Sequence, residues 1–411
     1  MTPCLIVGAG PYGLSLAAHL CAAGVEFRIV GTPMSPWLTA MPKGMCLKSE
    51  GFASTLFEPS GTFTLGMYCA EQNIPYKDIG LPIQATTFAN YGRAFQSRFV
   101  PNLEDRLVVQ VQRVDASFRV NLQDGGSIDA ARVVIASGIL PFAYIPPELA
   151  ELPHSACSHS GEHHEVAQFA GREVVVVGAG ASAMDVAAAL HDSGARVTVI
   201  TRRSSVRFQT PLGERSLFAR IRAPMTPVGP GWKSVLCTRA PLLFRLMPDA
   251  FRTDVVRGYL GPAPAWFTRK AVEGHVPVLT GSRIIGATLD GARANLRLSR
   301  NGAVTTVSAD HVIAATGYRV DVSRLDFLDR SVRTAVLCVD GSPRLSYHFE
   351  SSVPGLYFIG TASANTFGPM LRFAYGAGFA ARRLSRHLAA DARAPVPSRS
   401  RLQTQTVAAG D

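Results

Sequence analysis

The chain has 411 residues, of which 47% are hydrophobic, 17% charged and 8% aromatic, and this composition excludes a disordered, collagen-like or coiled-coil protein. At roughly 150 residues per domain, the length predicts two or three domains, each able to bury a core. The formal net charge of +11 is concentrated in residues 201–300, which hold 17 Lys and Arg against 5 Asp and Glu.

The first predicted elements are a strand, a glycine turn, a helix and a second strand. An apolar run at 4–7 leads into the spacing Gly8-x-Gly10-x-x-Gly13; a helix of small residues is expected over 11–23 and a β-branched strand over 26–30. This is the dinucleotide-binding fingerprint in its usual setting. A single match is weak evidence in a chain with 37 glycines.

Residues 33–137 show a weaker pattern of secondary-structure signals than the first unit. Residues 33–75 are rich in loops. Alternating apolar and polar residues then predict strands at 107–114 and 118–122, followed by an apolar strand at 131–137. We interpret them as a β-meander that returns the chain to the first sheet.

The first unit recurs at a constant offset of 170 residues. Val174–Val177 precede Gly178-x-Gly180-x-x-Ala183, a helix is expected over 181–192, and a strand over 196–200. Two fingerprints in the same strand, turn and helix setting are strong evidence for two nucleotide sites. The glycines allow the tight turn and the close approach of a pyrophosphate, which the amide groups of the helix N-terminus then face.

The rest of the chain is predicted more coarsely. An insertion at 211–281 is rich in Pro, Phe, Leu and Arg, and its helical stretches either form a substrate wall or cover the sheet. Residues 312–317 and 355–360 are expected to return to the first domain, and the tail from 389 is expected to be disordered.

The residues after each unit indicate which nucleotide binds where. Arg202 and Arg203 follow the strand of the second unit, and a pair of guanidinium groups suits the 2′-phosphate of NADPH. The first unit is then left for FAD, although Gly31 stands where an acid for the ribose is expected. The predicted fold is α/β with two Rossmann-like dinucleotide-binding domains, a β-meander and a helical insertion. The FAD-binding domain is discontinuous (1–156 and 311–388), and the NADPH-binding domain (157–310) is inserted in it.

The cysteines, the histidines and the basic residues indicate which other sites and partners are expected. Seven cysteines lie far apart without a C-x-x-C pair, so no disulfide framework, zinc knuckle or redox dithiol is indicated. We expect a cytoplasmic protein without a membrane span. No metal site is expected, because the His159, His163 and His164 region has no known ligand spacing. The basic stretch could be a solvated face or attract an acidic partner, an anionic membrane or a phosphorylated molecule. Nucleic acid is not expected, because no nucleic-acid-binding signature accompanies the arginines.

Taken together, the motifs resemble those of the NADPH-dependent class B flavin monooxygenases, which include flavin-containing and Baeyer–Villiger monooxygenases and the lysine and ornithine N-hydroxylases. The resemblance covers residues 1 to about 388. It rests on the two glycine units, Ala136-Ser137-Gly138, Ala315-Thr316-Gly317-Tyr318 and Gly355-Leu-Tyr-Phe-Ile-Gly360. The chain departs from the Baeyer–Villiger fingerprint, of which only His159 is present, so the subclass stays open.

The resemblance implies two sets of cofactor-binding residues and a flavin-facing helix near residues 366–372. For FAD they are Gly8, Gly10, Pro11, Tyr12, Gly13, Trp37, Lys48, Ser49, Val114, Gly138, Gly360, Phe367 and Gly368. For NADPH they are Gly178, Gly180, Ala181, Ser182, Arg202, Arg203, Thr316 and Gly317. Lys48 and Arg372 are the candidate catalytic cations.

The resemblance also implies a reaction. NADPH would reduce FAD, O2 would add at flavin C4a, and the resulting (hydro)peroxide would transfer one oxygen to the nitrogen, sulfur or ketone carbon of a small organic substrate. Two alternatives remain open from the sequence. One is an NADPH-dependent flavoprotein reductase that passes electrons to an acidic carrier protein, and the other is a flavin-binding sensor without enzyme activity. The oligomeric state is not predicted.

Overall fold

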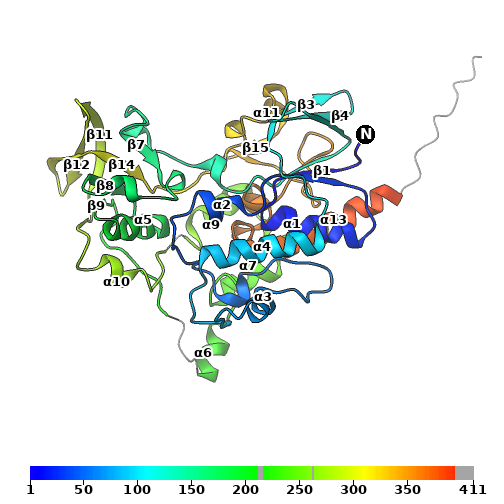
Figure 1. Ribbon diagram of the computed structural model, residues 1–411, viewed down its shortest axis with the longest axis horizontal. Helices are drawn as coiled ribbons and strands as arrows, with labels where there is room; N and C mark the ends of the chain where they lie inside the picture. Colours follow the sequence, from blue (N-terminus) through cyan, green and yellow to red (C-terminus); the bar gives the residue numbers. More distant parts are fainter. Residues whose placement is uncertain (212–215, 262, 394–411) are drawn as a thin grey trace, which may run out of the picture.

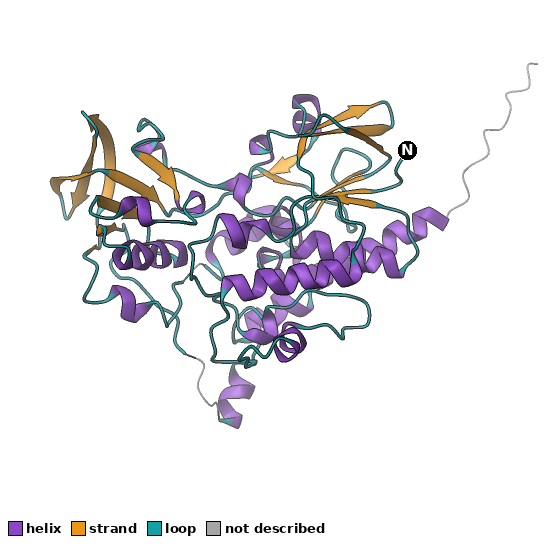
Figure 2. Ribbon diagram, in the orientation of Figure 1, coloured by secondary structure: helices purple, strands orange, loops and turns teal. Residues whose placement is uncertain are grey.

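The computed structural model describes residues 1–211, 216–261 and 263–393. Two lobes, each built on a parallel sheet, lie at opposite ends of the molecule, and a group of helices lies below and between them (Figure 1). Figure 2 shows that each lobe also carries a small antiparallel sheet at its outer side.

The first lobe is built on a four-stranded parallel sheet in the order β17-β6-β1-β2. Its short strands are buried on both faces, which agrees with the unbroken apolar runs in the sequence. Helix α1 starts directly after the first glycine turn and packs against α13 and α4. The elements are β1 (Leu5–Val7), β2 (Arg28–Val30), β6 (Val133–Ile135), β17 (Leu356–Phe358), α1 (Pro11–Ala22), α4 (Ala85–Phe99) and α13 (Ala377–Arg393).

The second lobe repeats this arrangement in a five-stranded parallel sheet, with the order β10-β9-β8-β14-β7. Its fingerprint lies between β8 and α5, as the 170-residue offset predicts. The elements are β7 (Cys157–His159), β8 (Glu173–Val177), α5 (Ala181–Asp192), β9 (Arg196–Ile200), β10 (Val278–Leu279) and β14 (His311–Ala314).

Two predicted boundaries need correction. The strand β14, expected to return the chain to the first domain, pairs instead with β8 and β7, so the second unit extends beyond residue 310. The strand β10, placed in the insertion, pairs with β9. Both strands are short, and pairing in a parallel sheet depends on partners far away in the chain, which the local pattern does not show.

The small antiparallel sheets were predicted only in part. The expected meander is present as β3 (Val108–Val114), β4 (Ser117–Leu122) and β5 (Ser127–Ala130), and β6 then enters the first sheet. The second lobe carries a similar meander that the sequence reading missed. It consists of β11 (Arg283–Asp290), β12 (Arg293–Arg300) and β13 (Ala303–Ala309). A separate two-stranded sheet pairs β15 (Cys338–Val339) with β16 (Ser342–Pro343).

The insertion is helical, but most of it packs on the first lobe. Helices α8 and α9 contact α12 (Ala364–Phe367), and Leu242 and Val256 pack against the core of the first lobe. The insertion therefore joins the two lobes. The helices of the insertion are α6 (Leu217–Arg222), α7 (Trp232–Arg239), α8 (Pro241–Arg245), α9 (Asp249–Gly258) and α10 (Arg269–Val272). Three further α-helices lie outside the insertion: α2 (Ser35–Thr39), α3 (Leu65–Glu71) and α11 (Arg330–Ala335).

The predicted tail begins inside a helix, because residues 389–393 belong to α13; residues 394–411 lie outside the described part of the chain. None of the described helices combines the length and the hydrophobicity that are needed to cross a bilayer. Within the same residues, no group of three or more His, Cys, Asp and Glu side chains is placed to hold a metal ion.

A buried chain of hydrogen bonds ties β7 to β14. The Ser158 hydroxyl lies 2.6 Å from Nε2 of both His163 and His311, and His311 Nδ1 lies 3.1 Å from the carbonyl oxygen of Ser155. That carbonyl can only accept, so His311 carries its proton on Nδ1, Ser158 donates to His311, and His163 donates to Ser158. Burial lowers the pKa of both histidines, that of His163 to about 4.

We expect the protein to lose stability as the pH falls from 7 to 5. The unfolded histidines take up protons near pH 6.5, whereas folded His163 stays neutral to about pH 4, so acid favours unfolding. The expected loss is about 1–2 kcal/mol, measured by urea unfolding at the two pH values. His163→Gln should flatten this dependence, and His191→Gln, at an exposed histidine of α5, should not; an unchanged slope in His163→Gln would contradict the assignment.

Candidate active site

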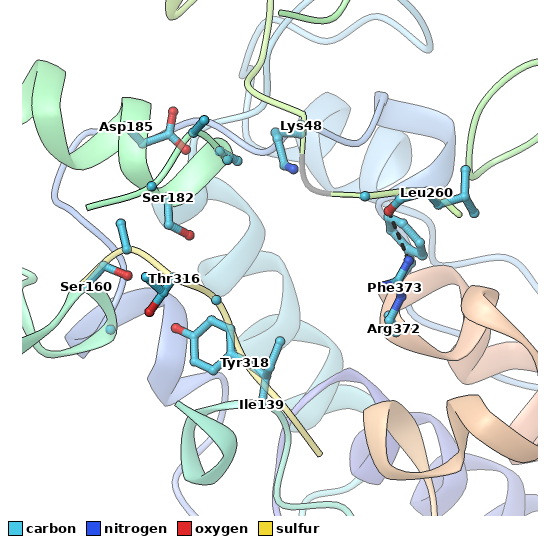
Figure 3. A pocket seen from close by; sticks show the side chains of 18 of the residues that line it. Lys48, Ile139, Ser160, Ser182, Asp185, Leu260, Thr316, Tyr318, Arg372 and Phe373 are labelled. Carbon is cyan, nitrogen blue, oxygen red and sulfur yellow. Dashed lines mark hydrogen bonds between the residues drawn. The ribbon is translucent and has the colours of Figure 1, made fainter. Parts of the chain in front are cut away.

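A cavity of about 1800 Å³ lies between the two lobes (Figure 3). The first lobe contributes Trp37, Lys48 and Ser49 to its walls, and the second contributes the glycine turn before α5. The insertion closes another side, since residues 256–257 and 260–261 also line the cavity. The site therefore lies where two nucleotides, one from each lobe, can meet.

The second fingerprint forms part of the cavity wall. Gly178 has a φ of +148°, and a Cβ atom there would lie 2.4 Å from the carbonyl oxygen of Ala315, so only glycine fits this turn. Helix α5 begins at Ala181 after Gly180, and no side chain caps its N-terminus. Its first amide groups, beside the Ser182 side chain, are available to an anion such as a pyrophosphate.

The predicted arginine pair reaches the same cavity. Arg202 and Arg203 are exposed, follow directly after β9 and line the cavity, and no ion pair with either of them occurs within the described residues. Thr316 and Gly317 line it as well, and the backbone there is fixed because Gly317 accepts hydrogen bonds from Tyr144 N and His159 Nε2. The structure thus brings together the residues predicted for NADPH.

One residue of this wall was missed. Ser160 follows β7, is 3% exposed and lines the cavity, yet its hydroxyl oxygen has no hydrogen-bond partner among the residues that the structure describes. A buried hydroxyl without a partner is costly, so a ligand that bonds to it would recover that energy. No sequence pattern distinguishes this serine, because its role depends on β7 lying beside β14 and on η4 (Ser160–Glu162) contacting α5.

Ser160→Ala is expected to have two effects of opposite sign. Removal of the unpaired hydroxyl should stabilise the unliganded protein by about 1 kcal/mol, and loss of a hydrogen bond to the nucleotide should raise the Kd for NADP⁺ three- to tenfold. Denaturation of the apoprotein and calorimetry with NADP⁺ measure the two effects. Ser282→Ala is the matched control, because Ser282 lines the cavity but already donates to Thr280. Parallel losses of stability and affinity in Ser160→Ala would contradict this role.

The first fingerprint also has the form of an anion site. A Cβ atom on Gly13 would lie 1.9 Å from the carbonyl oxygen of Gly8, so the helix and the turn meet without space for a side chain. Gly10 has no heavy atom within 4 Å of a Cβ position, and α1, with Pro11 at its start, has no side-chain cap at its N-terminus. These features suit a pyrophosphate. Gly8, Gly10, Pro11, Tyr12 and Gly13 are not part of the large cavity's wall, and the Tyr12 hydroxyl donates to the carbonyls of Leu371 and Phe373.

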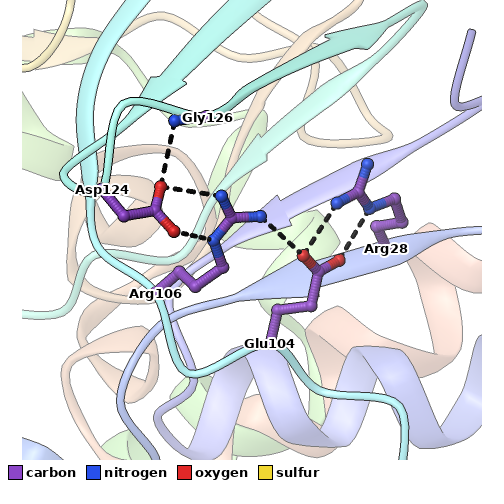
Figure 4. Close-up of polar contacts among 5 residues, drawn as sticks. All are labelled: Arg28, Glu104, Arg106, Asp124 and Gly126. Atoms are coloured by element: carbon purple, nitrogen blue, oxygen red, sulfur yellow. Dashed lines mark hydrogen bonds and ion pairs between the residues drawn. The ribbon is translucent and has the colours of Figure 1, made fainter.

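The structure offers an acid for the first ribose in place of the one missing at Gly31. Figure 4 shows Glu104 held by Arg28 and Arg106, at 2.7 Å for both Arg28 contacts and 3.3 Å for Arg106, so this carboxylate is already paired. The next residue, Asp105, lies beside the end of β2 and accepts a hydrogen bond of 2.6 Å from Thr32. Asp105 is the candidate ribose contact.

The other residues predicted for FAD fall into two groups. Trp37, Lys48 and Ser49 line the cavity, and Trp37 packs edge-on against Phe88. Val114, Gly138, Gly360, Phe367 and Gly368 are not among the lining residues. The Phe367 ring is fully buried against Phe349 and Phe379, so the structure does not show it at the cavity and its contact with FAD stays a prediction.

Lys48 and Asp185 bring opposite charges into the cavity from opposite lobes (Figure 3). Lys48 donates to the carbonyl of Ala263 at 3.3 Å, and Asp185, on α5, accepts from Thr268 at 3.0 Å. Burial raises the pKa of Asp185 to about 6 and lowers that of Lys48, while the attraction between the two charges opposes both shifts. Asp185 was not predicted; its position on α5 becomes significant only once Lys48 faces it.

Arg372 lines the cavity but is used mainly by the protein itself. Its Nη1 donates to Val256 and its Nη2 donates to Tyr259 and Leu260, at 2.7–2.9 Å. These carbonyls lie at the C-terminal end of α9, where a cation is favoured. Arg372 therefore fastens the insertion to the first lobe, and a catalytic role for it stays a prediction.

Comparison with known proteins now identifies the family. Residues 5–226 match the model for pyridine nucleotide-disulphide oxidoreductases, which is more than half of the chain. The chain belongs to this family. It is a flavoprotein oxidoreductase that uses FAD and NADP(H).

The relatives of this flavoprotein differ in activity. It is 28% identical over 223 residues to ferredoxin–NADP reductase 1 of Cupriavidus taiwanensis, which covers 50% of the chain and 54% of the reductase. It is 26% identical to the indole-3-pyruvate monooxygenase YUCCA1 of Oryza sativa subsp. japonica over 344 residues, 77% of each protein. The chain thus spans about half the length of the reductase and more of the monooxygenase.

The fold agrees with a solved hydroxylase structure. The reduced form of the ornithine hydroxylase PvdA from Pseudomonas aeruginosa superimposes with a TM-score of 0.72 and 17% sequence identity, and the match covers 96% of this chain and 100% of that one. This likeness shows an α/β fold with two dinucleotide-binding sheets, as the sequence analysis predicted.

Proposed function

We propose that this flavoprotein is an NADPH-dependent monooxygenase that transfers one oxygen atom of O2 to a small organic substrate, by N- or S-hydroxylation or by Baeyer–Villiger oxidation. The observation that carries the proposal is the cavity between the lobes, which the insertion lines on one side and into which Lys48 and Asp185 project. Oxygen transfer requires a substrate to be held close to the flavin and away from water, and a walled cavity of about 1800 Å³ suits that requirement.

In this proposal, each lobe binds one of the two cofactors. The first lobe, with Gly8, Gly10 and Asp105, holds FAD, which supplies the activation of O2 when bound and reduced. The second lobe holds NADPH through the N-terminus of α5, Ser160 and the Arg202–Arg203 pair. This assigns residues 1–156 and the chain beyond β14 to the FAD-binding domain, with the NADPH-binding domain between them.

Lys48 and the insertion provide the environment of the reaction. The Lys48 ammonium, which donates to the Ala263 carbonyl, favours negative charge that develops in the cavity, and the attraction of Asp185 favours its charged form. The insertion, fastened through Arg372, excludes water from that side. Among the lining residues, Cys46 is the one cysteine; burial raises the pKa of its thiol, which disfavours thiolate chemistry at the site.

The test measures the fate of oxygen. Purified enzyme with NADPH and ¹⁸O2 is supplied with amines, thioethers and ketones, and the oxygenated product is compared with the NADPH consumed. The proposal expects one labelled oxygen in the product for each NADPH oxidised with at least one substrate class. Hydrogen peroxide as the only product for every class, together with fast reduction of a ferredoxin, would overturn it.

The second candidate is an NADPH-dependent reductase that passes electrons to an acidic carrier protein. Two observations favour it: the similarity to ferredoxin–NADP reductases over half the chain, and the basic excess of residues 201–300. The same experiment separates the candidates, because a reductase transfers electrons to ferredoxin at a rate that falls with salt and inserts no oxygen into small molecules.

A further inference from the structure

The insertion presents an apolar face to solvent. On α7, Trp232 and Leu236 are 62% and 51% exposed, and on α8 and just after it Leu243 and Leu246 are 46% and 65% exposed. Trp232 and Leu236 are four residues apart on α7, so they lie on the side of the helix opposite the buried Ser234 and Cys237. We call this set, Trp232, Leu236, Leu243 and Leu246, the α7–α8 face. Exposed tryptophan and leucine side chains on two helices that contact each other are unusual for a surface that meets only water.

The surroundings of this face are basic. Residues 217–258 contain seven arginines and lysines but only two acids, Asp249 and Asp254, and Asp249 is paired with Arg252 and Arg344. Lys233 and Arg239 are exposed on α7 itself, and neither forms an ion pair within the described residues. A second copy of this face would bring like charges together, so self-association is disfavoured and an anionic partner is favoured.

A small pocket adjoins the face. It has a volume of about 260 Å³ and is lined by Arg239 at the end of α7, Leu242 of α8 and Arg382 of α13, together with aromatic rings. The rings are those of Phe57, Tyr375 and Phe379. Two cations beside a ring-lined hollow with both polar and apolar walls match an amphiphile with an anionic head and a hydrocarbon chain.

We propose that the α7–α8 face and the adjoining pocket dock this protein on an anionic lipid surface, with the apolar side chains in the acyl region and the basic residues at the headgroups. Tryptophan and leucine flanked by Lys and Arg form the typical composition of a helix that lies in the membrane interface. A soluble acidic protein would be attracted by the same charges; the pocket with Arg239 and Arg382 at its wall favours a single anionic headgroup, and the test below separates the two partners. Docking of this kind involves no membrane-spanning helix.

The test uses the FAD-loaded full-length protein and vesicles in 0.1 M salt. We expect sedimentation with vesicles of equal parts phosphatidylglycerol and phosphatidylcholine, and little with phosphatidylcholine alone. Trp232→Ala/Leu236→Ala leaves the charge unchanged and should lower the partition coefficient at least tenfold, as should Lys233→Glu/Arg239→Glu. Arg382→Gln, in the pocket, should lower it severalfold.

The matched control removes an exposed apolar pair elsewhere. Leu107→Ala/Val109→Ala, in and before β3, should bind vesicles as the wild type does, and NADPH oxidation by every variant verifies its folding. Binding that salt abolishes but Trp232→Ala/Leu236→Ala does not change would mean simple charge attraction and would overturn the proposal. Failure to bind vesicles, with salt-sensitive binding of an acidic ferredoxin that depends on Lys233 and Arg239, would overturn it in favour of a protein partner.

Discussion

Replacement of Arg203 by alanine is expected to raise the KM for NADPH at least tenfold and to leave the KM for NADH almost unchanged. A tenfold change corresponds to about 1.4 kcal/mol, which is reasonable for loss of a guanidinium that bonds to a phosphate in a partly exposed site. The two cofactors differ only in the 2′-phosphate, so the ratio of their KM values isolates that contact. Steady-state kinetics with each cofactor measures the ratio directly.

The control for this experiment lies on the same loop. Arg207 is exposed like Arg203, but it is not part of the cavity wall, so Arg207→Ala removes an equal charge without removing the contact. This variant should keep the wild-type preference for NADPH. Equal losses for NADPH and NADH in Arg203→Ala would show that Arg203 does not bind the 2′-phosphate, and would assign it a general electrostatic role.

Gly10→Val is expected to give a folded protein that purifies without FAD and is therefore colourless. Gly10 has a φ of −84°, which any residue adopts, and a Cβ atom there would meet no other heavy atom within 4 Å. The new side chain would instead project into the space beside the N-terminus of α1, where a pyrophosphate would bind. The absorbance near 450 nm reports FAD, and the Tm, compared with that of FAD-stripped wild type, reports folding.

Two comparisons make the Gly10 result specific. Gly286→Val places the same side chain at an uncrowded glycine of β11 in the other lobe, and this variant should stay yellow. Gly13→Ala should fail to fold, because its Cβ atom would lie 1.9 Å from the Gly8 carbonyl oxygen. A yellow Gly10→Val protein would contradict the placement of FAD at the first fingerprint.

The two nucleotide-binding turns were predictable because their signal is local. Each fingerprint needs a glycine spacing, an apolar run before it and a helix of small residues after it, all within about 30 residues. The arginine pair after β9 was predictable for the same reason, since it follows directly on the strand that leads into the site. The observed strands and helices agree with these predictions, and the family match confirms the class of enzyme.

The remaining site residues could not be predicted, because their roles depend on contacts between distant parts of the chain. Ser160 becomes an unpaired hydroxyl in the cavity only when β7 and β14, whose paired residues are 155 positions apart, lie side by side. Asp105 reaches the end of β2 through pairing of its neighbour Glu104 with Val30. Arg372 was predicted as a catalytic cation; it lines the cavity, but its bonds to the end of α9 were not foreseen.

The sequence by itself therefore determined the form of the two turns: two glycine fingerprints of the dinucleotide type, and an exposed arginine pair beside the second. Backbone geometry and glycine spacing decide these features, and both depend on residues that are close together in the sequence. The tertiary structure alone decided which charges share the cavity, where the insertion packs and which strand ends the second sheet. Those features arise when strands and helices far apart in the chain pack to bury apolar surface, and no local pattern specifies that pairing.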